Sequence, residues 1–471
     1  MPEQVDVAII GAGTAGLSAL REVEKATERF VLIDAGDWGT TCAARGCMPS
    51  KALIEAANAW HRRHAFDGFG IRGAEGLSVD VPAVLARVRA LRDDFVQGPQ
   101  STPGRLGDRS IHGRATLLGP DRLRVGDREI AARSIILAPG STPVVPAPWR
   151  RLGDRILTSD SLFELPDLPR RIAVIGLGAI GVELAQAMAR LGCRVTGFDA
   201  AEQIGGLDDA HVAAVLHNAL GREVDLRLGA PADLAEGGDG LQVSGAGEPV
   251  TVDAVLVALG RRPAIDGLGL EALGVPLDDA GLPQVDPTTQ RIGDLPVFLA
   301  GDANGHRPIL HEAADEGHIA GRNAAAGRTV ARCRRRPLAI VFSAPQVARV
   351  GVPLADCDPE STAVGEVNFA RQGRARTAAV NEGLLRVHAD RASGRLLGAE
   401  MCAPAAEHMA HLLALAVERG MTVPEVLSMP IYHPVLEEGL RSALRQLARE
   451  LPTAGGSDLS RCDDLGHDAL D

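Results

Sequence analysis

Two cysteines lie five positions apart, just before an apolar run with helical character, in the segment GTTCAARGCMPSKALI at residues 39–54. A disulfide between Cys42 and Cys47 would close a small ring, which stabilises a fold less than a bridge across a long loop. Redox chemistry suits the pair better, because a helix N-terminus stabilises a thiolate and thiol–disulfide exchange moves two electrons. A zinc half-site is the alternative, but zinc ligands usually have shorter gaps and a second pair nearby, and no such pair is visible.

Bulk composition limits the functions open to the chain. Its 471 residues predict about three domains, and 45% hydrophobic with 23% charged residues is typical of a globular protein. The net charge of −12 argues against a general nucleic-acid binder, which needs a basic face. We interpret the arginines around Cys333 as a solvated loop: Arg332, Arg334, Arg335 and Arg336.

Cysteine usage and the N-terminal sequence indicate a compartment. The segment MPEQVDVAIIGAG has no basic stretch before its apolar run, and no apolar run is long enough to span a bilayer. Seven cysteines are sparse and odd in number, which does not fit a disulfide framework. We therefore expect a cytoplasmic protein with no membrane contact, in which a close cysteine pair is catalytic or metal-binding more often than structural.

A glycine-rich fingerprint follows the first apolar run, in VDVAIIGAGTAGLSAL. Gly11, Gly13 and Gly16 stand between a strand pattern and a helix pattern, and Asp34 ends the next apolar run about 20 positions on. The first glycine forms the turn, the second lets the backbone approach a pyrophosphate, and the third lets the helix pack on the strand. The acid can bond ribose hydroxyls, so the pattern predicts a dinucleotide site.

A second fingerprint, RIAVIGLGAIGVELAQAMARLG, repeats the pattern. It contains Gly176, Gly178 and Gly181, and Asp199 ends the following strand-like run. Two copies, each with strand, helix and acid in place, are far more specific than one glycine motif. The residues after Asp199 include no arginine or lysine to meet a 2′-phosphate, which predicts NAD rather than NADP at this site.

The remaining chain has no third fingerprint. Residues 335–451 alternate strand-like and helical runs, which predicts an α+β domain. The segment 452–471 is polar and rich in glycine and aspartate, so we expect a disordered tail in which Cys462 is a free surface thiol. The predicted fold class is α/β, with two doubly wound, Rossmann-like domains and an α+β C-terminal domain.

The cysteine segment resembles the redox-disulfide signature of the flavoprotein disulfide reductases. Further segments occur in the order of that family: ILAPGSTP, VLVALGRRP, PVFLAGDAN and YHPVLEEGL. The Pro-Ser-Lys after Cys47 and the segment ILHEAADEG are most similar to the dihydrolipoamide dehydrogenase branch. Two positions depart from the commonest motifs, since Pro139 and Val435 both stand where threonine is usual.

The resemblance implies two cofactors and their domains. The FAD-binding domain would comprise residues 1–148 and 269–332, the NAD-binding domain 149–268, and the dimerisation domain 335–451. The residues expected to contact FAD are Gly11, Gly13, Gly16, Asp34, Lys51, Ala115, Gly140, Ser141, Asp302, Leu310 and His311. The residues expected to contact NAD are Gly176, Gly178, Gly181, Glu183, Asp199 and Gly260.

His433 is the candidate general base. Glu438, at an expected helix start, can orient this imidazole, although a purely structural histidine is the alternative. The resemblance implies a homodimer in which His433 of one subunit completes the site of the other. Cys42 would exchange with a dihydrolipoyl thiol and Cys47 would contact the flavin, with hydride passed to NAD+. The expected partner is a lipoylated protein: the lipoyl domain of a 2-oxoacid dehydrogenase complex, the glycine cleavage carrier or a dedicated lipoyl carrier.

Two other functions remain open from the sequence. One is an NAD(P)H-dependent reductase of another disulfide or of a metal ion, although no paired-cysteine tail for mercuric ion is present. The other is a flavin-binding scaffold without turnover, which the retention of both cysteines, His433 and Glu438 disfavours. No resident metal is expected.

Overall fold

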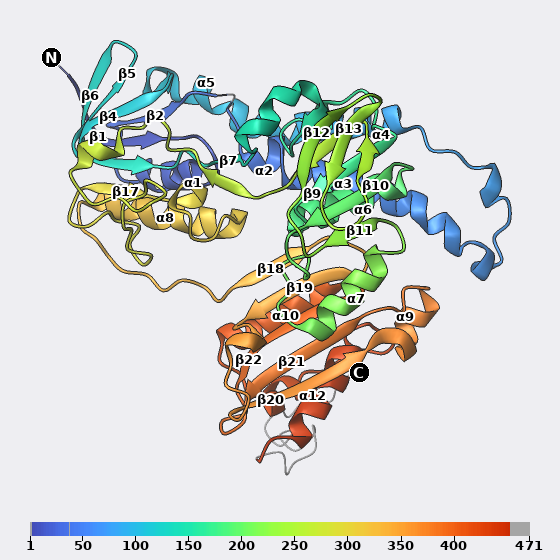
Figure 1. Cartoon of the computed structure of the whole chain (residues 1–471). Coiled ribbons are helices and arrows are strands. Elements are labelled where there is room, and N and C mark those ends of the chain that lie inside the picture. The colour runs from blue at the N-terminus through green and yellow to red at the C-terminus, as the bar shows by residue number, and fades with distance from the viewer. Residues whose placement is uncertain (1, 37, 453–471) are drawn as a thin grey trace.

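Three sheets organise the computed structural model, which describes residues 2–36 and 38–452 (Figure 1). The expected tail beyond Pro452, with Cys462, lies outside the described residues. Within the described ranges, no helix combines the length and apolar character needed to cross a membrane.

The first sheet carries the first fingerprint and has the strand order β3-β2-β1-β6-β5-β4, with β17 also paired to β6. Strands β1, β2, β3, β6 and β17 are parallel, whereas β4, β5 and β6 form an antiparallel meander. The strand bounds are β1 Glu3–Ile10, β2 Phe30–Asp34, β3 Ser110–His112, β4 Ala115–Gly119, β5 Arg122–Val125, β6 Arg128–Leu137 and β17 Val297–Leu299.

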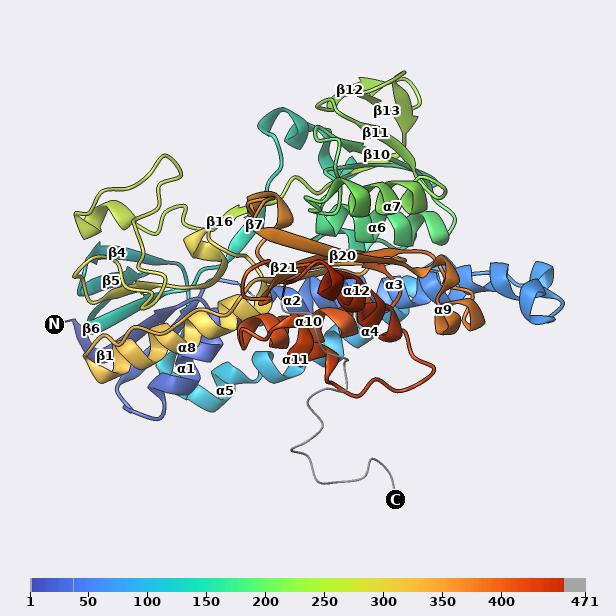
Figure 2. The same ribbon diagram turned by 90° about the horizontal axis from the view of Figure 1, so that it is seen from below.

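Two helices cover one face of the first sheet side by side, α1 (Thr14–Val23) and α8 (Leu310–Ala326), as Figures 1 and 2 show. Glycines permit their close approach. A Cβ on Gly317 would collide with the backbone of Ala15, and one on Gly321 would lie 2.6 Å from the carbonyl oxygen of Ala19. Any larger side chain at these two positions would force α8 away from the fingerprint helix.

The second sheet carries the second fingerprint and is parallel, with the order β11-β10-β9-β15-β8. Helix α6 (Ala179–Arg190) follows β9, α7 (Ala210–Leu220) follows β10, and a small antiparallel sheet β12-β13-β14 is attached. The strands of the second sheet are β8 Ile156–Leu157, β9 Arg171–Ile175, β10 Arg194–Asp199, β11 Asp225–Leu228 and β15 Ala254–Val257. Those of the small attached sheet are β12 Asp233–Gly237, β13 Gly240–Ser244 and β14 Val250–Val252.

Two features join these sheets. The chain leaves and re-enters the first sheet through the antiparallel ribbon of β7 (Ser141–Pro143) and β16 (Arg261–Pro263). Helix α3 (Cys47–His61) packs between α4 (Val81–Gln100) and α6, and buries Leu53 and Ile54 in a shared apolar cluster. The short helix α2 (Thr41–Ala44) contacts both α3 and α4, and the short helix α5 (Thr102–Leu106) contacts α4.

The third sheet is antiparallel, with the order β18-β19-β22-β21-β20. Helix α10 packs on β19 and β22, and α12 packs on β20 and β21. The bounds are β18 Leu338–Val341, β19 Gln346–Gly351, β20 Thr362–Asn368, β21 Leu384–Asp390, β22 Leu396–Ala403, α9 Gly373–Thr377, α10 Ala406–Glu418, α11 Val423–Leu427 and α12 Glu438–Arg449. The predicted fold class, two doubly wound units and an α+β unit, is therefore confirmed.

Candidate active site

The cysteine pair lies where two helices meet. Cys42 is in α2, whose first turn is capped by the Thr40 hydroxyl accepting the Ala43 N–H at 3.1 Å, and Cys47 is the first residue of α3. Both are half-buried free thiols that hydrogen-bond to each other. This arrangement is the reduced form of a pair whose sulfurs are already adjacent.

The two thiols differ in acidity. The hydrogen bond from Cys42 lowers the pKa of Cys47 from its usual 9.0 to about 7, against the effect of burial and with help from the charge of Lys51. The same hydrogen bond, together with burial, raises the pKa of Cys42. At neutral pH the thiolate therefore resides on Cys47, at the N-terminus of α3, where the helix dipole favours negative charge.

Lys51 lies one turn after Cys47 and joins three parts of the chain. Its Nζ donates to both carboxylate oxygens of Glu183 in α6, at 3.0 and 2.8 Å. Its ammonium group also lies 4.5 Å from the ring centre of Phe342, whose backbone N–H donates to Glu183 at 2.9 Å. The Glu183 carboxylate, expected at the NAD site, is thus committed to Lys51 and to the segment after β18.

A cavity of about 730 Å³ opens beside the first fingerprint. Its volume lies in the range of cofactor sites. Six of the eleven residues expected at FAD line it: Gly11, Gly13, Asp34, Ala115, Gly140 and Ser141.

The first fingerprint has the geometry that a bound pyrophosphate requires. Gly11 has φ +103°, and a Cβ there would collide with the carbonyl of Ala138. A Cβ on Gly13 would meet open space, while one on Gly16 would collide with the backbone of Gly11. The N-terminus of α1 has no side-chain cap, so its N–H groups remain available for an anion. These residues fit the dinucleotide part of FAD.

Asp34 is held by the same turn. Its carboxylate accepts the Ala12 N–H at 2.6 Å and the Gly36 N–H at 2.8 Å. A carboxylate has further lone pairs, so Asp34 can still accept hydrogen bonds from ribose hydroxyls.

The second fingerprint repeats this geometry closely. Asp199 accepts the Leu177 N–H at 2.6 Å and the Ala201 N–H at 2.9 Å. The glycines correspond as well: Gly176 (φ +92°) packs against Ala258, Gly178 faces open space, and Gly181 packs on Gly176. Gly260 has φ +91° and also faces open space, just after the segment that packs on the fingerprint.

The other five residues expected at FAD are not among those that line the cavity. Asp302 accepts the Ser141 hydroxyl at 2.7 Å and is thereby tied to the cavity wall. Leu310 and His311 begin α8, whose N-terminus has no side-chain cap. Lys51 contacts Glu183, and Gly16 serves helix packing.

His433 and Glu438 form a pair elsewhere. The imidazole Nδ1 lies 2.9 Å from Glu438 Oε1, and this contact lowers the pKa of Glu438. The His433 side chain is 80% exposed. Helix α12, which Glu438 begins, lies across the third sheet from α2 and α3 (Figure 1). Among the described residues, no hydrogen bond or ion pair joins His433 to the cysteine pair of its own chain.

Arg261 and Arg45 are two of the cavity-wall residues that sequence reasoning missed. Arg261 donates to the Ser141 hydroxyl at 2.8 Å and to Asp160 at 3.2 Å, although the quoted segment VLVALGRRP contains it. Arg45, between the two cysteines, also lines the cavity and lies 3.9 Å from Asp160. The sequence could have indicated Arg45, because it is a charged residue between two cysteines that are expected to carry redox chemistry.

The interpretation of the arginine run as a solvated loop is wrong for Arg334. Its side chain is only 17% exposed and forms ion pairs with Glu312 and Glu316 of α8 at 2.7 and 2.6 Å. Arg335 agrees with the interpretation, since its side chain is 69% exposed. Burial of the two glutamates explains the difference, because buried carboxylates require a cation or hydrogen-bond donors.

Comparisons with known proteins agree with this geometry. Residues 5–317 match the pyridine nucleotide-disulphide oxidoreductase family model, and residues 338–444 match the dimerisation domain of that family. The chain is 32% identical to a dihydrolipoyl dehydrogenase of Thermus scotoductus, covering 94% of this chain and 98% of the relative. A dihydrolipoyl dehydrogenase of Bacillus subtilis is 31% identical, with 93% and 97% covered.

Solved structures give the same result. LpdA from Mycobacterium tuberculosis superposes with a TM-score of 0.83 at 27% identity, covering 94% of this chain and 100% of that one. The flavoprotein disulfide reductase RclA from Escherichia coli has a TM-score of 0.81 at 25% identity, with 93% and 99% covered. The resemblance stated from sequence motifs is confirmed, as is the prediction of an oxidoreductase that uses FAD and NAD. The chain therefore belongs to the pyridine nucleotide-disulphide oxidoreductase family.

Proposed function

We propose that the chain oxidises protein-bound dihydrolipoyl groups to lipoyl groups and passes the electrons to NAD+, the reaction of a dihydrolipoamide dehydrogenase. The observation that carries the proposal is the contact between the Cys42 and Cys47 thiols at the start of α3. Lys51, four residues on, connects this helix to α6 of the second fingerprint. The names of the curated relatives support the choice of thiol substrate.

Both cofactors have residues to hold them. FAD would bind at the first fingerprint through the α1 N-terminus, Asp34 and the wall formed by Gly140 and Ser141. It supplies two-electron transfer between a dithiol and a nicotinamide. NAD would bind at the second fingerprint, where Gly178 leaves space for the backbone to approach a pyrophosphate and Asp199 can accept from a ribose diol.

The acidity of the two thiols supports the roles that we propose for them. In the oxidised enzyme a dihydrolipoyl thiolate attacks Sγ of Cys42, the Cys42–Cys47 bond breaks, and Cys47 leaves as the thiolate. The second substrate thiolate then attacks the substrate sulfur of this mixed disulfide, closes the lipoyl ring and releases Cys42, which takes up a proton. The lowered pKa of Cys47 suits a leaving thiolate, and the raised pKa of Cys42 suits a thiol that is reprotonated.

We infer that His433 of the partner subunit in a homodimer accepts the proton of each substrate thiol in turn, so that one proton passes on to Cys42 and the other remains on the imidazole. The exposure of His433 in the single chain and its contact with Glu438 support this role, because an orienting carboxylate increases the basicity of an imidazole. The substrate would be carried by a lipoyl domain of a 2-oxoacid dehydrogenase complex, by the glycine cleavage carrier or by a dedicated lipoyl carrier.

Mixed dimers test this assignment. Neither a His433→Ala homodimer nor a Cys47→Ser homodimer should oxidise dihydrolipoamide, since losing a general base costs about 10²–10⁴-fold in rate. A heterodimer isolated with two different affinity tags should regain one working site, because one subunit supplies the disulfide and the other the histidine. An inactive heterodimer that retains FAD would show that the base lies elsewhere.

A second candidate is an NAD(P)H-dependent reductase of another disulfide. The structural likeness to the flavoprotein disulfide reductase RclA favours it as the alternative. Turnover of dihydrolipoamide with NAD+, measured beside NADH-dependent reduction of lipoamide, glutathione disulfide and cystine, separates the two. Preference for a disulfide other than lipoamide would favour the second candidate.

A further inference from the structure

The segment between α8 and β18, residues 327–337, is fastened to the units on both of its sides. The Arg332 N–H donates to the Thr288 carbonyl at 2.9 Å, beside the first sheet. The Arg336 N–H donates to the Glu418 carboxylate of α10 at 2.9 Å, beside the third sheet. This linker therefore makes contacts with the flavin unit and with the dimerisation unit.

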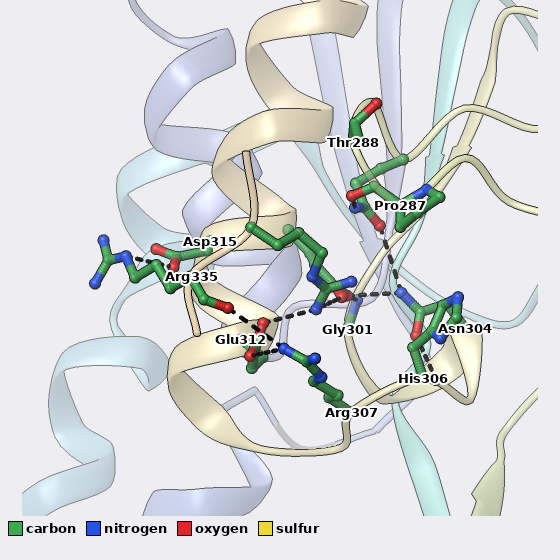
Figure 3. Close-up of polar contacts among 12 residues, drawn as sticks. Pro287, Thr288, Gly301, Asn304, His306, Arg307, Glu312, Asp315 and Arg335 are labelled. Carbon is green, nitrogen blue, oxygen red and sulfur yellow. Dashed lines mark hydrogen bonds and ion pairs between the residues drawn. The ribbon is translucent and has the colours of Figure 1, made fainter. Parts of the chain in front are cut away.

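Arg334 is a largely buried residue of the linker, with a side chain that is 17% exposed. Its guanidinium group reaches both Glu312 and Glu316, one turn apart on α8. These two carboxylates are 5% and 2% exposed. Among the described residues, Arg307 forms its ion pair with Glu312, at 3.0 Å (Figure 3), and Arg334 is the one cation that forms an ion pair with Glu316.

Glu316 also stabilises the turn at Gly301–Asn304, beside the proposed flavin site. Its Oε2 accepts the Gly301 N–H and the Asn304 side-chain amide, both at 2.7 Å. Gly301 has φ +77°, and a Cβ there would lie 2.9 Å from the Cβ of Ala15 in the fingerprint helix. The turn therefore packs closely against α1 and is held by the Glu316 carboxylate.

The next residue of this turn is Asp302, which connects it to the cavity. Asp302 accepts the hydroxyl of Ser141, and Ser141 lines the cavity beside the first fingerprint. A continuous series of contacts thus runs from Arg334 through Glu316 and the Gly301–Asp302 turn to the cavity wall. A displacement of Arg334 can reach the cavity wall only if each contact in this series constrains the next one. A substitution at Arg334 tests whether this is so.

We propose that Arg334 is a positioning residue for the flavin site, which sets the Gly301–Asp302 turn through Glu316 and makes this turn depend on the linker to the dimerisation unit. The inference rests on FAD binding at the first fingerprint, as proposed above, and does not depend on the thiol substrate. A purely structural ion pair would stabilise the linker without altering the environment of the flavin.

The experiment compares Arg334→Met with Arg335→Met in the full-length holoenzyme. Arg335 is the matched control, because it contacts Asp315 of the same helix at the surface and no residue of the series (Figure 3). The readouts are the two-electron midpoint potential of bound flavin, measured by dye equilibration, and the visible circular dichroism of the flavin. Dye equilibration needs no dihydrolipoamide, so failure of the proposed thiol substrate would not affect this result.

Arg334→Met should make the midpoint potential of the flavin more negative and change the circular dichroism of the flavin. The reason is that Glu316 would lose its cation, and the Gly301–Asp302 turn would then lose the support that Glu316 gives it. Arg335→Met should leave both unchanged. An Arg334→Met enzyme that melts at a lower temperature but has wild-type potential and circular dichroism would overturn the proposal. If Arg334→Met yields no folded holoenzyme, the same measurements are made on Arg334→Lys. Lysine keeps the positive charge but lacks the planar guanidinium group that can bind two carboxylates at once. A smaller shift in the same direction would support the proposal, and a wild-type potential would overturn it.

Discussion

Lys51 and Glu183 form an ion pair that joins the helix of the redox cysteines to the helix of the second fingerprint, with Nζ 2.8 Å from Oε2 and 3.0 Å from Oε1. The side chain of Glu183 is 7% exposed and that of Lys51 is 30% exposed. The pair places a positive charge near Cys47 and a compensating negative charge on α6, the helix of the second fingerprint.

Lys51→Met should slow dihydrolipoamide oxidation while FAD stays bound. The substitution removes the cation that helps to lower the pKa of Cys47 and leaves the Glu183 carboxylate buried with only the Phe342 N–H. A charge-assisted hydrogen bond of about 1.5–3 kcal/mol corresponds to a loss of roughly 10- to 160-fold in kcat. Lys25→Met is the matched control, since Lys25 contacts Glu22 at the surface. Equal activity of the two variants would contradict this role.

The reactivity of the reduced enzyme should depend on pH through Cys47. Alkylation of the Cys42→Ser variant cannot test this, because Cys42 donates the hydrogen bond that lowers the pKa. Iodoacetamide should therefore be applied to the reduced wild-type enzyme, and mass spectrometry should give a midpoint near pH 7 at Cys47. Alkylation of Cys42 before Cys47 as pH rises would show that the thiolate has been assigned to the wrong sulfur.

The same shift makes a prediction about stability. The pKa of Cys47 is lower in the folded chain, about 7, than its usual value of 9.0. Ionisation of Cys47 therefore stabilises the reduced protein fully above pH 9, and this contribution is lost as pH falls through 7. Urea unfolding under reducing conditions should show a stability difference between wild type and Cys47→Ser that grows between pH 7 and 9. A difference that is constant over this window would argue against the shift.

The geometry of the second fingerprint predicts a preference for NAD+ over NADP+. The Asp199 carboxylate would repel a 2′-phosphate, and a preference of about tenfold in kcat/KM requires only ~1.4 kcal/mol. Asp199→Asn retains an oxygen that can accept the Leu177 N–H but removes the negative charge. The ratio of kcat/KM with NAD+ to kcat/KM with NADP+ should therefore decrease. Asp225→Asn, at a surface position of β11, should leave it unchanged. A wild-type enzyme that is faster with NADP+ would refute the assignment.

Glu438→Gln should slow flavin reduction by dihydrolipoamide while reoxidation by NAD+ stays near the wild-type rate. Val435 provides no hydroxyl, and the His433 ring contacts the Glu438 carboxylate. The amide of glutamine keeps a hydrogen bond but removes the negative charge that stabilises the imidazolium. Glu437→Gln, one residue earlier, is the matched control. A defect confined to the NAD+ step would contradict the role of the pair.

Local patterns in the sequence were enough for the two fingerprints. The turn, the packing glycine and the acid of each lie within about 25 residues, so the motif specifies the contacts of Asp34 and Asp199 directly. The cysteine pair was predictable for the same reason. Each of these features depends on residues that are neighbours in the chain or on adjacent strands.

The contacts of Arg334 and Glu183 were not predictable in this way. Arg334 stands in a charge run that resembles a solvated loop, and only the folding of the linker back over α8 brings it to Glu312 and Glu316. Glu183 stands in the NAD fingerprint, yet its partner Lys51 is 132 positions earlier. The proposed relation between His433 and the cysteines involves a second subunit, whose position no pattern in one chain can predict.

Anaerobic stopped-flow reduction of the purified holoenzyme by dihydrolipoamide tests the central claim most directly. The oxidised enzyme should be reduced within its turnover time, with loss of flavin absorbance or appearance of a long-wavelength thiolate band, and added NAD+ should restore the oxidised spectrum and yield NADH. Cys47→Ser should keep the flavin spectrum but show no reduction by dihydrolipoamide. Rapid reduction of that variant, or a wild-type enzyme that NADH reduces and dihydrolipoamide does not, would contradict the account.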